Sequence, residues 1–128
     1  MIREDLASSI RAMRPAVPAK DYAESQRFYE AIGFEARALG PALTEMSLGA
    51  HSFLLQDFYV PQFANNFVMH MSVENVDAWW EHIEALGLEK SFKVRAPIAP
   101  RLEPWGLRVA YLFDPSGVLW QINSRPQG

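Results

Sequence analysis

The sequence predicts an α+β fold built from two tandem βαβββ modules with eight strands in total. Three observations predict it: an alternating hairpin near the C-terminal end, two capped amphipathic helix patterns, and a repeat that relates the two halves of the chain. The 128 residues, 49% of them hydrophobic and 21% charged, have an ordinary globular composition. We therefore expect one domain over residues 1–128.

The hairpin occupies residues 105–123, WGLRVAYLFDPSGVLWQIN. Its DPSG turn, residues 114–117, has Asp, Pro and Gly at the positions that a type I turn favours. Apolar and other residues alternate on both sides of this turn. We expect Trp120 to be buried against a helix, whereas Gln121 and Asn123 point to the opposite face, towards a cavity.

The first half reads as a strand, a helix and three strands. Arg14 to Ala19 is a strand whose two prolines favour an edge position. A helix runs from Asp21, a capping residue, to Ile32, and Gly33 ends it. Three strands follow at residues 34–39, 43–48 and 51–56. Residues 1–13 form a mildly amphipathic lead-in that we expect to pack on the domain or on a partner chain.

The second half repeats this order at a spacing of 54 positions. Glu30, Ala31, Gly33 and Glu35 recur as identical residues in EALGLE at 84–89. We predict a strand at 67–73, a helix at 76–86, a strand at 88–96 and then the hairpin. The modules span about residues 13–57 and 67–124. Two loops rich in aromatic residues and proline, at 57–66 and 97–105, lie outside the repeat.

Composition and charge argue against several classes of partner. Twelve Lys and Arg against fifteen Asp and Glu give a net charge of −3 with no basic run, so no nucleic acid is expected. No apolar run is long enough to span a membrane and no secretory signal is present, so no membrane partner and a cytoplasmic location are expected. Because the chain has no cysteine, disulfides and thiolate zinc sites are excluded.

Three segments resemble the vicinal oxygen chelate superfamily, which includes glyoxalase I, extradiol dioxygenases and bleomycin resistance proteins. They are VPAKDYAESQRFYEAIGFE, MSVENVDAWWEHIEALGL and the hairpin, and APRLEPWG before the hairpin looks most like the bleomycin resistance branch. The resemblance covers about residues 13 to 124. It implies a curled eight-stranded mixed sheet around a cavity and, because many members dimerise, a homodimer.

The resemblance also places the metal ligands of the metal-dependent members. Their positions in this chain hold Arg14, Val68, a residue near Leu54, and Gln121. A cation and two aliphatic side chains cannot bind a divalent ion, and one amide oxygen is too few ligands. We therefore predict no metal, no cofactor and no catalytic residue.

His70 leaves an alternative open, because it lies two positions beyond Val68 on the same strand face. It is either a core or cavity-lining histidine with a hydrogen-bond partner, or part of a displaced metal site with Gln121 and Gln56. In the second case the protein is a metal-dependent lyase, isomerase or dioxygenase.

The aromatic residues of the two loops have two readings as well. Phe58, Tyr59, Phe63 and Trp105 gain little from a core at these positions. They either stack on a flat or cationic ligand or are buried against another subunit.

The favoured hypothesis is a small-molecule binding protein of the glyoxalase/bleomycin resistance type. It would sequester an aromatic or cationic compound without metal and without catalysis, in a cavity within one chain or between two. A regulatory or partner-binding module is the third possibility. The predicted ligand-binding residues are Arg14, Phe58, Tyr59, Phe63, His70, Trp105, Gln121 and Asn123.

Overall fold

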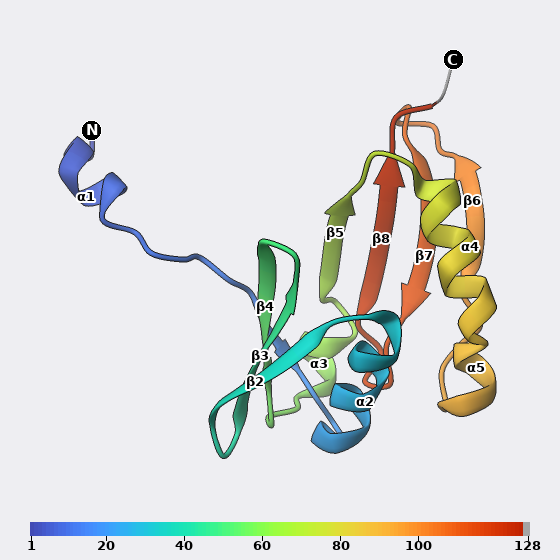
Figure 1. The fold of residues 1–128 in the computed structure, drawn as a ribbon, viewed down its shortest axis with the longest axis horizontal. Coiled ribbons are helices and arrows are strands. Elements are labelled where there is room, and N and C mark those ends of the chain that lie inside the picture. Colours follow the sequence, from blue (N-terminus) through green and yellow to red (C-terminus); the bar gives the residue numbers. More distant parts are fainter. Residues whose placement is uncertain (127–128) are drawn as a thin grey trace.

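The computed structural model describes residues 1–126, in which eight strands form two four-stranded sheets (Figure 1). The first sheet has the order β1-β4-β3-β2, and the second has the order β5-β8-β7-β6. Their bounds are β1 Ala16–Pro18, β2 Glu35–Gly40, β3 Leu43–Leu48, β4 His51–Gln56, β5 Val68–Ser72, β6 Ile98–Leu102, β7 Arg108–Phe113 and β8 Leu119–Ser124. The helices are α1 Glu4–Ser8, α2 Tyr22–Ile32, α3 Pro61–Ala64, α4 Val76–Leu86 and α5 Leu88–Ser91.

Both sheets are mixed in the same way. β1 lies parallel to β4 and β5 lies parallel to β8, whereas the remaining neighbours are antiparallel. The predicted α+β fold with eight strands is confirmed. The strands are divided between two sheets that share no ladder in the described chain, and the curl around a cavity stays a prediction.

The two long helices begin and end as the repeat predicts. The side chain of Asp21 accepts a hydrogen bond from the Glu24 amide, and that of Asn75 accepts one from the Ala78 amide, both at 3.1 Å. These N-caps satisfy amides that the first helical turn leaves free. The helices end at Gly33 and Gly87, which have φ of 133° and 58°. The spacing of 54 positions therefore relates two real helices.

The strand predicted at Leu88 to Ala96 is wrong. Leu88–Ser91 forms the short helix α5, and β6 lies later, inside the segment predicted as a loop. Leu88 is buried and anchors this turn against the core. β6 is an edge strand, and an edge position tolerates Pro100 because the lost amide is not needed by a neighbour.

The N-terminal lead-in does not pack on its own domain. α1 contains no buried residue, and the segment projects away from the two sheets (Figure 1). Packing on a partner chain, the other expected outcome, stays a prediction.

One core connects the two sheets. Rings from both halves pack together, with Tyr29 5.7 Å from Trp120 and 4.9 Å from Phe53 between centroids. The prediction that Trp120 is buried against a helix is confirmed, because its indole donates a hydrogen bond to the hydroxyl of Tyr29 in α2. Gln121, the next residue of β8, points to the opposite face as strand alternation requires.

Candidate functional site

A first cavity of about 610 Å³ lies beside β1, between the end of β4 and the segment that leads to β5. Its lining residues are Ala16, Pro18, Gln56, Phe58, Val60, Gln62, Phe63, Asn66 and Phe67. It therefore contains two of the four loop aromatics that the sequence singles out, Phe58 and Phe63.

The free edge of β1 forms one wall of this cavity. The carbonyl of Pro15 accepts from the Leu54 amide at 2.9 Å, and the Ala19 amide donates to the Gln56 carbonyl at 3.1 Å. Since alternate residues of a strand turn their backbone groups to the same side, Ala16 and Pro18 face the cavity. The segment 57–66 covers this edge and contains α3, which starts at Pro61, a favoured first helical residue.

The chemistry of the cavity wall is aromatic and amide-rich. Phe58, Phe63 and Phe67 supply rings, whereas Gln56, Gln62 and Asn66 supply neutral groups that both donate and accept hydrogen bonds. Phe63 is 64% exposed, so its ring is free to contact a ligand. Within the described residues, no ionisable side chain lines this cavity.

Tyr59 lies outside this lining. It is half-buried, and the Nζ atom of Lys20 is 5.8 Å from the centroid of its ring. The ring therefore already has a cation from the same chain.

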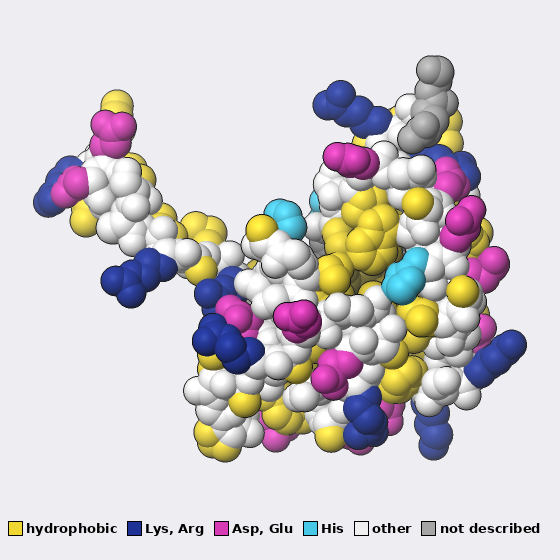
Figure 2. All heavy atoms as spheres, in the orientation of Figure 1, with side chains coloured by type: hydrophobic (Ala, Val, Ile, Leu, Met, Phe, Trp, Pro, Cys, Tyr) yellow, Lys and Arg dark blue, Asp and Glu magenta, His cyan; other side chains and the backbone are white. Residues whose placement is uncertain are grey.

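A second cavity of about 540 Å³ lies between the β3–β4 hairpin and the exposed edge of β5. Figure 2 shows a hollow between the two sheets where hydrophobic side chains gather. Met69, Met71, Trp79 and Trp120 are among its lining residues, together with His70.

His70, Gln121 and Asn123 lie together on β5 and β8. The predicted cavity face of β8 is wrong for the two larger cavities of the described residues: Trp120 lines the second cavity, and Gln121 and Asn123 line neither. His70 and Gln121 are register partners, and the amide nitrogen of Asn123 lies 2.9 Å from Nε2 of His70. His70 therefore has a side-chain hydrogen-bond partner on the neighbouring strand. Gln56 belongs to the other sheet and lines the other cavity, so the displaced ligand set is not brought together.

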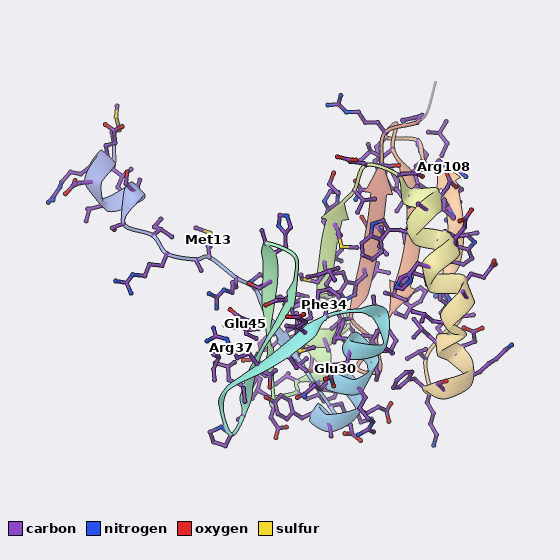
Figure 3. All side chains as sticks on the ribbon, in the orientation of Figure 1. Met13, Glu30, Phe34, Arg37, Glu45 and Arg108 are labelled. Atoms are coloured by element: carbon purple, nitrogen blue, oxygen red, sulfur yellow. The ribbon has the colours of Figure 1, made fainter. Side chains whose placement is uncertain are left out.

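Arg14 is paired within the chain with Glu45, a carboxylate of β3. Its Nη1 is 3.0 Å from Oε2 of Glu45, and Nη2 of Arg37 is 3.0 Å from Oε1 (Figure 3 labels Glu45 and Arg37). The Glu45 side chain is only 12% exposed, so two arginines pair with one largely buried carboxylate. This cluster lies on the first sheet, away from His70.

Trp105 does not join the other loop aromatics. It is 58% exposed, and its loop between β6 and β7 lies at the opposite end of the second sheet from α3 (Figure 1). It lines neither of the two larger cavities of the described residues.

The sequence reasoning missed Glu45, Gln62, Asn66 and the second cavity. Gln62 and Asn66 lie within the loop already singled out, where amides among the aromatics were a usable signal. No group of three or more His, Cys, Asp or Glu side chains within residues 1–126 is placed to hold a metal ion. Over the same residues, no helix has the length and apolar character that crossing a bilayer requires.

The chain is similar to known proteins in sequence profile and in fold. The model of the family described as the Glyoxalase/Bleomycin resistance protein/Dioxygenase superfamily matches residues 11–122. No curated protein sequence matches. Among solved structures, a bleomycin-binding protein complexed with bleomycin aligns with a TM-score of 0.76 at 19% identity, covering 91% of this chain and 100% of that one.

Two further structures show the same fold. TnmS3, an antibiotic binding protein from Streptomyces sp. CB03234, has a TM-score of 0.71 at 24% identity and covers 92% of this chain and 98% of its own. A lactoylglutathione lyase from Agrobacterium tumefaciens has a TM-score of 0.62 at 21% identity, covering 90% and 94%. Binding proteins and an enzyme therefore share this architecture.

Proposed function

Because the chain belongs to the Glyoxalase/Bleomycin resistance protein/Dioxygenase superfamily, we propose that it is a small-molecule binding protein that sequesters an aromatic ligand in the first cavity. The observation that carries the proposal is the combination of three phenylalanine rings with three neutral amides around about 610 Å³. A volume of this size suits a drug-sized ligand, since such pockets measure roughly 300–1,000 Å³.

The lining favours one part of the expected ligand class. Phenyl rings stack on flat rings, and amides recognise neutral donors and acceptors such as those of amides and heterocycles. A purely cationic ligand would meet no carboxylate among these lining residues. The ligand is therefore a flat aromatic compound with neutral polar groups.

Sequestration fits these groups better than turnover. Phenyl and carboxamide side chains hold a ligand by contact and hydrogen bonds, and neither is a nucleophile or a strong acid or base. The metal-dependent alternative needed His70, Gln121 and Gln56 in one place, and Gln56 lies on the other sheet. The names of two structural relatives, a bleomycin-binding protein and an antibiotic binding protein, support binding as the function.

We also propose that the protein is a homodimer, as the family resemblance implies. The exposed lead-in and the uncovered edge of β5 support this second statement. The ligand site proposed above is built within one chain, so binding does not depend on the dimer.

The test is equilibrium binding to bleomycin and to a set of neutral planar heteroaromatic compounds, measured by calorimetry. For a compound that binds, Phe63→Ala should weaken binding about tenfold, because one aromatic contact contributes about 0.5–1.5 kcal/mol beyond its buried area. Gln62→Ala should weaken binding of compounds that carry amides and not of those without them.

Trp105→Ala is the matched control, since it removes an equally exposed ring outside the cavity. Equal losses for Phe63→Ala and Trp105→Ala would place the ligand elsewhere. No binding by any compound of the set would overturn the proposal.

A further inference from the structure

We propose that the ligand of the first cavity is a peptide-like aromatic compound whose extended amide unit pairs with the free edge of β1 at Ala16. This inference rests on the proposed function and names the chemical class that the same site recognises. It is carried by the backbone groups on the cavity side of β1, by the short length of that edge, and by an uncharged lining.

The backbone of β1 alternates between β4 and the cavity. The carbonyl of Pro15 and the amide of Ala19 are hydrogen-bonded to β4, so odd-numbered residues turn towards that strand. Ala16 and Pro18 turn the other way, and both line the cavity. Because β1 is the outer strand of its sheet, no neighbouring strand or loop backbone within residues 1–126 satisfies the amide and carbonyl of Ala16 or the carbonyl of Pro18.

A donor and an acceptor on one residue select a matching pair in the ligand. In an antiparallel ladder, a residue gives its N–H to the carbonyl of its partner and accepts the N–H of that same partner. An extended acylated amino acid amide carries both groups on one side, so it can exchange two hydrogen bonds with Ala16. The carbonyl of Pro18 then accepts one further N–H, and since proline has no amide hydrogen it offers no donor there.

The edge is too short for a strand of another protein, which usually has about 5–6 residues. β1 contains only the three residues Ala16–Pro18. The carbonyl of Phe58 accepts from the Ala19 amide at 3.1 Å, so the segment after β4 closes the edge directly after Pro18. α3 also packs against β1 (Figure 1). The edge therefore matches a small molecule with few amide units.

The rest of the lining selects an uncharged compound with an aromatic group. Phe58 and Phe63 are 53% and 64% exposed, so their rings are free to stack on the ligand, and Gln56 and Gln62 add neutral amides. A free amino acid would bring an ammonium and a carboxylate against a lining without charged partners, and burial of an unpaired charge is costly. The amino acid unit is therefore blocked at both ends.

Replacing one N–H of the ligand by oxygen tests the pairing without altering the protein. Quinoline-2-carbonyl-phenylalanine amide has a planar ring system, a phenyl ring and the required unit, and its ester analogue lacks only the N–H that donates to Ala16. In calorimetry, we expect the ester to bind about five- to tenfold more weakly, because it loses one hydrogen bond. The hydrogen exchange of the Ala16 amide, measured by NMR, should slow when the amide compound binds.

A pair of variants tests the donor of the protein. Ala16→Pro removes the N–H that faces the cavity, and an edge strand tolerates proline where its N–H points away from the neighbouring strand. Ala16→Val is the matched control, since it adds a side chain of similar size and keeps the N–H. We expect Ala16→Pro to weaken binding of the amide compound about fivefold more than Ala16→Val does. Both variants should change binding of 2-phenylquinoline, which has no amide, to the same extent.

Each outcome decides. Equal affinities for the amide and the ester, unchanged exchange of the Ala16 amide, or binding of 2-phenylquinoline without binding of the amide compound would overturn the inference. These measurements use the wild-type chain, so they decide even where Ala16→Pro fails to fold. The proposed function stands in each of these cases if Phe63→Ala still weakens binding of 2-phenylquinoline. If no planar compound binds at all, the proposed function fails and this inference fails with it.

Discussion

Removing one oxygen atom, the hydroxyl of Tyr29, should destabilise the protein strongly. Tyr29 is fully buried, and its hydroxyl donates to Oδ2 of Asp114 at 2.6 Å and accepts from the indole of Trp120 at 2.9 Å. Tyr29→Phe keeps the ring and its aromatic neighbours. It leaves one lone pair of the carboxylate and one indole N–H without a partner in the core.

The size of the loss follows from these two groups. A hydrogen bond to a charged acceptor contributes about 1.5–3 kcal/mol, and a buried donor left unsatisfied costs about 1–3 kcal/mol. Asp114 keeps the amides of Ser116 and Val118 at 2.8 and 2.9 Å, so the turn itself remains. We expect the free energy of unfolding to fall by about 3–4 kcal/mol.

Urea denaturation at pH 7 measures this change, with the slope of the transition expected to stay the same. Tyr22→Phe is the control, because the hydroxyl of Tyr22 bonds to Thr44 in a half-buried position. It should cost about 1 kcal/mol. If Tyr29→Phe costs no more than Tyr22→Phe, the buried network does not contribute as argued.

The same variant should be sensitive to pH. Burial raises the pKa of the Asp114 carboxyl, while the hydrogen bond from Tyr29 acts to lower that pKa. When the folded-state pKa of a carboxyl lies above its unfolded-state pKa, the contribution of that carboxyl to the free energy of unfolding is fully present below the unfolded pKa. This contribution is lost as pH rises through the folded pKa. Because the hydrogen bond from Tyr29 lowers this pKa, it stabilises the ionised carboxylate more than the protonated one. The loss of unfolding free energy caused by Tyr29→Phe should therefore be smaller at pH 3.5 than at pH 7. An equal loss at both pH values would contradict an ionised acceptor.

Three further variants test other contacts. Arg14→Met should cost only about 1 kcal/mol in urea, because Arg37 still pairs with Glu45; a loss of several kcal/mol would show that Arg37 does not compensate. The pKa of Asp77 is lowered by its hydrogen bond from Arg108, so that pair stabilises above the unfolded pKa and is lost as pH falls through the folded one. Asp77→Asn should thus lower the melting temperature at pH 6 and have no effect near pH 3, whereas an effect independent of pH would rule out the ion pair as its cause. Gly117→Ala should cost about 1–3 kcal/mol because φ is 89° there, and an unchanged melting temperature would mean that the turn relaxes.

The parts of the fold that sequence could predict are those with local signals. The caps at Asp21 and Asn75 and the DPSG turn lie within four residues of the contacts that explain them. The repeat predicts a strand directly after Gly87, as in the first half. The second half instead has additional residues between Gly87 and the next strand, β6, so the repeat does not extend past the helix. Only burial of Leu88 in the common core shows that this segment turns instead of extending.

The candidate site was less predictable because it depends on which segments meet. Phe58 and Phe63 come from one loop and share a cavity, whereas Trp105 comes from another loop at the far end of a sheet. In the sequence all three are aromatic residues of loops, and only the arrangement of the strands shows that Trp105 lies far from the other two. Likewise, Arg14 could be expected to need a carboxylate, but its pairing with Glu45 follows from how β3 lies beside β4.

The network around Asp114 bears on how the chain could be divided. It joins α2 to the last hairpin, and the amide of Lys20 donates to the hydroxyl of Ser116 at 2.8 Å in the same region. A protease cut within residues 57–66 would therefore produce two fragments that are stable only in association, since each fragment alone would expose part of the one shared core. Residues 57–66 also form much of the lining of the first cavity. A ligand bound there would hold the two cut ends in place and would favour the associated fragments over the separated ones.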